Sequence, residues 1–267
     1  MVESIRELDQ ICQKPNYKTV GNWMVCHILR PAALPTTWLL LHTNVTANQV
    51  TFASLIVGLA GAFLLSRPSS NAFVAGVLLL QFWYYLDHVD GQIARYRKTV
   101  SLSGRFHDFM VHHVIHSVIL FCLGFYCFYK TGWMFVIVLG FVGSMGIVMF
   151  NLINDVKCKT FIERLLSCNF LEIVQKETGT IHAALETRGS FLRKIFSLLH
   201  KSVEIHVLMN VLTFAAIFEL LWPVIDTRFW LLLFYSFVTP ILAITKSTYF
   251  ISKKKIDLEF NSQFNVK

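Results

Sequence analysis

Residues 87–113 read DHVDGQIARYRKTVSLSGRFHDFMVHH, and they lie where two long apolar runs of the chain meet. Asp87 and Asp90 stand near the end of the first run, and Asp108 lies near the start of the second. Carboxylates at a membrane–water boundary are costly unless a partner neutralises them. On a helix, residues three or four apart share a face. The spacing therefore predicts that two helices bring these three aspartates to one point.

Divalent cations are the expected neutraliser of such a cluster, because hard oxygen ligands suit Mg²⁺, Mn²⁺ or Ca²⁺. The sequence thus predicts a metal site formed by Asp87, Asp90 and Asp108. Small residues beside the site leave room for close helix approach or for a bulky polar ligand. These are Gly91, Ala94 and Gly104.

The composition is typical of an integral membrane protein, since 55% of the 267 residues are hydrophobic and only 15% are charged. Each of six apolar runs is near the ~20 residues that cross a bilayer core. We expect an all-α polytopic membrane protein with six transmembrane helices. Their predicted ranges are 48–66, 72–94, 104–129, 132–153, 204–224 and 229–250.

The chain around these spans divides into three parts. Residues 1–47 are predicted to be an interfacial segment on the cytoplasmic leaflet. Residues 48–250 form the expected membrane catalytic domain, with a cytoplasmic insertion at 154–203 that reads as two amphipathic helices. Residues 251–267 are the expected C-terminal tail, of which 257–267 is expected to be frayed.

The net charge of +8 is distributed as in a membrane protein rather than a nucleic-acid-binding one. Lysine and arginine gather in 95–105, 157–201 and 253–255, whereas the three other loops carry only Arg67, Lys130 and Arg228. This imbalance predicts that both termini and the metal site face the cytoplasm. Membrane lipid, and not nucleic acid, is the expected partner. Residues 1–20 lack an apolar core, so we expect no cleavable signal peptide.

The stretch from 87 to 112 resembles the signature of the CDP-alcohol phosphotransferase (CDP-alcohol phosphatidyltransferase) family, D-x2-D-G-x2-A-R-x8-G-x3-D-x3-D. Seven of its eight positions match, including the eight-residue gap between Arg95 and Gly104. The matching residues are Asp87, Asp90, Gly91, Ala94, Arg95, Gly104 and Asp108. His112 stands where the family has its last aspartate.

The resemblance implies transfer of a phosphate-linked group from a CDP-alcohol to an alcohol acceptor, with release of CMP, in phospholipid or glycolipid synthesis. The donor is CDP-diacylglycerol or a CDP-headgroup, and the cofactor is Mg²⁺ or Mn²⁺. A second copy of the chain, which would form a homodimer, is a further candidate partner. The family's pattern assigns the three aspartates to the metal, the small residues to the nucleotide and Arg95 to a phosphate or carboxylate. Asn48 either lines the nucleotide site or only caps the first span.

His112 leaves three interpretations open. An imidazole is a suitable general base near neutral pH, so His112 is the predicted catalytic residue; it is also able to ligate metal. Alternatively, another residue such as His113 is the base and His112 only lines the pocket. In the third interpretation the site is catalytically impaired.

Two other classes of protein compete with this assignment. His107, His112 and His113 superficially fit one histidine box of a membrane di-iron oxidase. No second double-histidine motif accompanies it, and the spacing from Asp87 to Asp90 and Gly91 stays unexplained. An ion transporter would use the aspartates, but it does not require the Gly-x2-Ala-Arg spacing.

Overall fold

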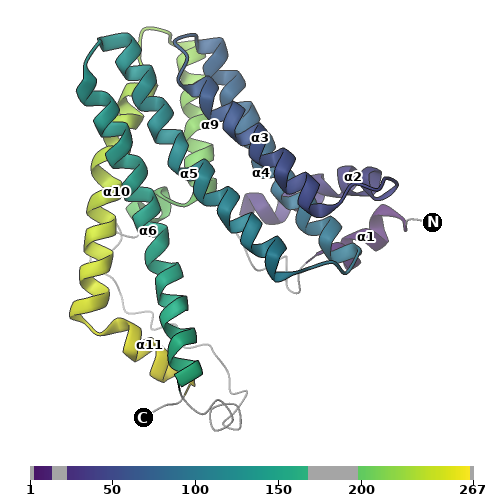
Figure 1. The fold of residues 1–267 in the computed structure, drawn as a ribbon. Helices are drawn as coiled ribbons and strands as arrows, with labels where there is room; N and C mark the ends of the chain where they lie inside the picture. The colour runs from purple at the N-terminus through teal and green to yellow at the C-terminus, as the bar shows by residue number, and fades with distance from the viewer. Residues whose placement is uncertain (1–2, 14–22, 168–197, 265–267) are drawn as a thin grey trace.

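The computed structural model describes residues 3–13, 23–167 and 198–264, and every element in these ranges is helical. Figure 1 shows long helices that run together as a bundle, with shorter helices beside one end of it. The all-α fold predicted from the sequence is therefore confirmed.

Five helices are long and apolar enough to cross a membrane. They are α3 (Ala47–Leu65), α4 (Ser70–Tyr96), α5 (Leu102–Thr131), α6 (Met134–Ser167) and α10 (Thr227–Ser252). The predicted run at 204–224 corresponds to α9 (Ile205–Leu221), whose 17 residues extend ~26 Å. That length is at the lower limit for crossing a bilayer core of ~30 Å.

Local capping sets the helix ends. Thr46 Oγ1 accepts from the backbone N–H of Gln49, and the Gln49 side chain returns a bond to the Thr46 N–H, so α3 begins with a capping box. Gly132, at φ +71°, ends α5 in the left-handed conformation that glycine adopts without strain. Hydropathy alone carries no such signals, and the predicted spans differ from these helices by one to three residues at most ends.

Small residues let the membrane helices approach closely. A Cβ added to Gly61 would lie 2.9 Å from the Gly76 carbonyl oxygen, and one on Gly76 would lie 2.7 Å from that of Gly61. This contact joins α3 to α4 without a bulky side chain between them. α3 also packs on α5, whereas the backbones of α4 and α5 stay further apart and are bridged by side chains.

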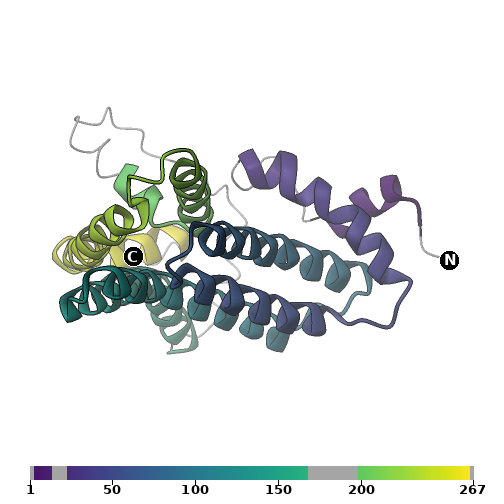
Figure 2. The same cartoon turned by 90° about the horizontal axis from the view of Figure 1, so that it is seen from above.

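The N-terminal helices lie against the end of the bundle where α4 ends and α5 begins, which we call the motif end. They are α1 (Ile5–Cys12), a π-helical turn η1 (Val25–Leu29) and α2 (Arg30–Leu41). Figure 2 shows α1 and α2 on one side of α3 and α4, away from α10. Buried Gln92 fixes α2 on α4, because it accepts from Thr37 Oγ1 at 2.7 Å and donates to the Arg30 carbonyl at 2.9 Å.

Two predictions for the end of α6 and for the C-terminus need correction. α6 does not stop at residue 153 but continues to Ser167, so its 34 residues extend ~51 Å, well beyond the bilayer core. The predicted tail contains a further helix, α11 (Lys255–Phe264), so it is not simply frayed. α11 packs on α6: the Phe161 and Phe260 rings lie 5.3 Å apart, and Lys157 pairs with Glu259 at 3.1 Å. The predicted turn in the insertion, and the predicted start of its second helix, lie outside the described residues.

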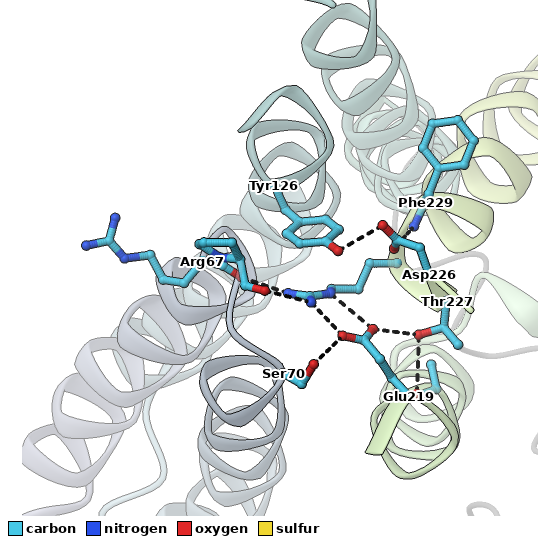
Figure 3. Close-up of polar contacts among 10 residues, drawn as sticks. Arg67, Ser70, Tyr126, Glu219, Asp226, Thr227 and Phe229 are labelled. Atoms are coloured by element: carbon cyan, nitrogen blue, oxygen red, sulfur yellow. Dashed lines mark hydrogen bonds and ion pairs between the residues drawn. The ribbon is translucent and has the colours of Figure 1, made fainter. Parts of the chain in front are cut away.

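A buried ion pair joins α9 to α10 at the opposite end of the bundle (Figure 3). Arg228 and Glu219 are only 1% and 3% exposed, and Nη2 lies 2.5 Å from Oε1. Arg228 also donates to the carbonyls of Arg67 and Pro68 in the loop between α3 and α4. Arg228, expected to be a loop charge, is therefore a buried link between α9, α10 and the loop that joins α3 to α4.

Further side chains complete this network. Ser70 Oγ and Thr227 Oγ1 each donate to Glu219 at 3.0 Å, and the Arg228 guanidinium lies 3.5 Å from the centre of the Tyr126 ring. Tyr126 in turn donates to Asp226, as Figure 3 shows. Because buried charges are stable only when paired and hydrogen-bonded, the network fixes the ends of four helices relative to one another.

Candidate metal and nucleotide site

A trio of metal-ligating side chains lies between α4 and α5. His112 Nε2 is 2.9 Å from Asp87 Oδ1 and 3.4 Å from Asp108 Oδ1. One ligand atom from each of the three residues lies within 4.8 Å of the others. Asp108 and His112 meet because they are one helical turn apart on α5, and Asp87 faces them from α4. The sequence prediction that these two helical faces converge is borne out for Asp87 and Asp108.

Asp90 does not join this trio. Its side chain is 8% exposed, and Oδ2 accepts from Thr51 Oγ1 of α3 at 2.6 Å. Three residues advance a helix by about 300°, so Asp90 is turned some 60° from Asp87. This rotation directs Asp90 towards α3. Its predicted role as a metal ligand stays a prediction.

His88, which the sequence pattern did not single out, also contacts the trio. His88 Nδ1 lies 3.4 Å from Asp87 Oδ2, so both oxygens of Asp87 face an imidazole. The ring also packs on Tyr84, with centroids 5.1 Å apart. Adjacent residues point about 100° apart on a helix. His88 is therefore not among the residues that share a face with Asp87, and the spacing pattern did not include it.

Two of the predicted nucleotide-contact positions lie next to each other. A Cβ on Gly104 would be 3.5 Å from Asn48 Oδ1 and 3.3 Å from Ser101 Oγ. Asn48 is exposed at the start of α3, and the neighbouring Thr46 caps that helix. Thr46, and not Asn48, is therefore the residue that caps α3. Ala94 is half-buried on α4.

Arg95 is held by the N-terminal helix. Its Nε donates to the Cys12 carbonyl at the end of α1. Its guanidinium lies over Gly91, where an added Cβ would be 3.1 Å from Nη1. The prediction placed Arg95 towards a phosphate or carboxylate; in this structure the contact at Nε is a backbone carbonyl. α1 is therefore part of the surroundings of the motif.

We expect Leu8→Ala to release α1 from α4. Leu8 and Cys12 are fully buried in a cluster that includes Val89 and Ile93 of α4. Removing a buried leucine side chain costs roughly 2 kcal/mol or more, which is at least about a 30-fold change in the docking equilibrium. The test is maleimide labelling of Cys12 in a chain whose other five cysteines are replaced.

The docked Cys12 should react slowly, because burial raises the pKa of its thiol to about 11. Leu8→Ala should label at least about tenfold faster. Ile11→Ala is the matched control, since Ile11 is 44% exposed on the same helix. Equal labelling rates for the two variants would mean that the Leu8 contact does not hold α1.

Three further histidines contact residues outside the trio. His113 Nε2 lies 3.0 Å from Asp155 Oδ2, and buried His116 pairs with Asn151 across α5 and α6. His200 packs on the Phe150 ring; His182 lies outside the described residues. In the described part of the chain, the trio is the group of at least three acidic, histidine or cysteine side chains close enough to share an ion. A single imidazole in that group gives no support to a di-iron histidine box.

The donor set of the trio fits a divalent cation. It offers carboxylate oxygens from two residues and one imidazole nitrogen, which suits Mn²⁺ and related first-row ions and, through the oxygens, Mg²⁺. The trio is half-buried, so a bound ion would retain access to ligands from outside the protein.

The class that fold and site define is a helical membrane protein with two aspartates and a histidine between two spans, close enough together to hold a metal ion. A family model described as CDP-alcohol phosphatidyltransferase matches residues 44–171. The match covers α3 to α6 and the whole motif. No curated protein sequence matches the chain.

Proposed function

We propose that the protein transfers a phosphate-linked group from a CDP-alcohol to an alcohol acceptor, with release of CMP, within a membrane. The observation that carries the proposal is the meeting of Asp87, Asp108 and His112 inside the family-matched region. Seven of the eight motif positions support the same reaction.

In this reaction the acceptor oxygen forms a bond to the phosphorus of the transferred group. The bond from that phosphorus to the bridging oxygen breaks, and CMP leaves with the electron pair. The proton of the alcohol passes to a base. A divalent cation, when bound, supplies charge neutralisation for the pyrophosphate and the departing CMP. Asp87 and Asp108 are its proposed protein ligands, and His112 is the proposed third member of the reacting centre.

The surrounding residues have proposed roles in holding the substrate. Asn48 and Gly104 lie together at the start of α3 and α5, where the absence of a side chain on Gly104 leaves room for a nucleotide. Thr51 fixes the carboxylate of Asp90 beside the site. Arg95, held by α1, contributes positive charge at the motif end.

The test is to incubate the purified chain with a panel of CDP-alcohols and acceptors and to detect CMP and the product by mass spectrometry. One arm supplies CDP-diacylglycerol with polar acceptors such as polyols, sugars and phosphorylated alcohols. The other supplies CDP-headgroups with diacylglycerol. Release of CMP that depends on both an acceptor and a divalent cation is the expected result. Binding of CDP without turnover in either arm would favour a catalytically impaired family member.

We propose that the metal site faces the cytoplasm, because basic residues gather at the motif end. Single cysteines introduced at Ser69 and Thr99, both exposed in loops at opposite ends of α4, test this orientation in a cysteine-free chain. An impermeant maleimide should label position 69 in intact cells, and position 99 only after permeabilisation. Labelling of position 99 in intact cells would show that the metal site faces the outside.

A further inference from the structure

We infer that His112 binds the divalent cation directly through Nε2, and that this ligand makes the site prefer Mn²⁺ or another first-row ion over Mg²⁺. The inference rests on the proposed function, because it concerns the ion at the same site. It assigns to His112 a role that differs from the general base favoured by the sequence.

The first support is the direction of Nε2. This atom lies 2.9 Å from Asp87 Oδ1 and 3.4 Å from Asp108 Oδ1, so it points between the two carboxylates. Neighbouring ligands of an octahedral ion with bonds of ~2.1 Å are themselves ~3 Å apart. The two distances from His112 Nε2 are close to this spacing, and the two carboxylates also lie within 4.8 Å of each other. A base that used Nε2 would have to present this nitrogen to the alcohol instead.

The second support is the packing of the imidazole ring. The ring meets Trp83 edge-on, with centroids 5.3 Å apart, and Trp83 is fully buried. This contact limits rotation of His112 away from the carboxylates. Rigid placement of a ligand lowers the entropic cost of ordering it around an ion.

The third support is the change of ligand type. Imidazole nitrogen is a softer donor than the carboxylate oxygen that the family motif has at this position, and Mg²⁺ prefers oxygen. Affinity for nitrogen-containing sites rises along the series from Mn²⁺ towards Cu²⁺. Exchange of aspartate for neutral histidine also removes one negative charge. The loss of charge weakens both ions, whereas the change from oxygen to nitrogen weakens Mg²⁺ more than Mn²⁺.

Pulsed electron paramagnetic resonance of Mn²⁺ bound to the purified full chain tests the inference. The spectrum of a directly coordinated imidazole carries a nuclear modulation from ¹⁴N, which is replaced by that of ¹⁵N when histidine is ¹⁵N-labelled. We expect this nitrogen signal in the wild-type chain and in His113→Ala. His113 is the matched control, because it is the next residue on α5 and pairs with Asp155.

His112→Asp restores the oxygen donor of the motif and should bind Mn²⁺ without the nitrogen signal. Mg²⁺ should displace Mn²⁺ from this variant at concentrations about tenfold lower than from the wild type. Wild-type binding of Mn²⁺ that is lost in Asp87→Asn but lacks the nitrogen signal would overturn the inference and leave the proposed function intact. Such a result would favour a base that is oriented by Asp87 and uses Nδ1. Absence of Mn²⁺ binding in the wild-type chain would overturn both.

Discussion

Asp87→Asn is expected to lower CMP release by at least about 10³-fold. Asp87 is the one carboxylate of the trio that comes from α4, and both of its oxygens face neighbouring imidazoles. An amide has one oxygen acceptor and no charge, so the substitution removes the α4 contribution to cation binding. Charge stabilisation by a bound ion is worth several kcal/mol in the transition state, and each 1.36 kcal/mol is tenfold in rate. The measurements are the CMP release rate and the Mn²⁺ dissociation constant.

Asp155→Asn is the matched control for Asp87→Asn. Asp155 is also an aspartate on a long helix beside a histidine, but its partner is His113 and its side chain is 57% exposed. Asp155→Asn should change the rate of CMP release by less than about threefold, because exposed ion pairs contribute little. Wild-type rates that persist in Asp87→Asn, or after thorough chelation, would contradict a metal-dependent reaction at this site.

Arg228→Leu is expected to destabilise the protein by ~3–5 kcal/mol, because it leaves the carboxylate of Glu219 buried without its partner. The measurement is the free energy of unfolding in detergent, titrated with a denaturing surfactant. Glu219→Leu combined with Arg228→Leu should recover much of the loss, since replacing both charges removes the unpaired group.

Glu163→Gln provides the reference for this measurement. Glu163 lies 3.8 Å from Lys159, but both side chains are largely exposed on α6. Its removal should cost less than ~1 kcal/mol. A double variant that is as unstable as Arg228→Leu would show that the packing of Arg228 on Tyr126 and Phe73, and not the charge pair, holds this end together.

The approach of Asp87 to Asp108 and His112 followed from the sequence because the spacing within each helix decides which side chains share a face. Asp108 and His112 are one turn apart, and the apolar runs on either side fix which helices carry them. The turn of Asp90 towards Thr51 was not foreseen. Thr51 lies on α3, outside the motif, and helical periodicity does not say which neighbour a side chain will face.

The end of α6 could not be predicted from hydropathy. Its apolar run ends near residue 153, which predicted the end of the span, yet the residues that follow are mostly good helix formers such as Lys157, Lys159 and Leu165. Hydropathy measures where the bilayer ends, and the helix continues past it.

Packing between segments that are distant in the sequence could not be predicted from it. The bond from Arg95 to Cys12 joins residues 83 positions apart, and the link from Arg228 to Arg67 spans 161 positions. Pairing at such separations depends on how the helices assemble, and no periodicity within one element encodes it.

The pairing of Glu219 with Arg228 also bears on how the chain enters the bilayer during synthesis. Glu219 emerges from the ribosome nine residues before Arg228, so α9 first meets the translocation machinery with an uncompensated carboxylate. A charged residue costs up to ~2.5–3.5 kcal/mol on entry into a bilayer, and α9, at 17 residues, has little apolar length to offset that cost. Arrival of Arg228 neutralises the carboxylate. We therefore expect α9 and α10 to insert together as a hairpin, because their pairing neutralises both charges.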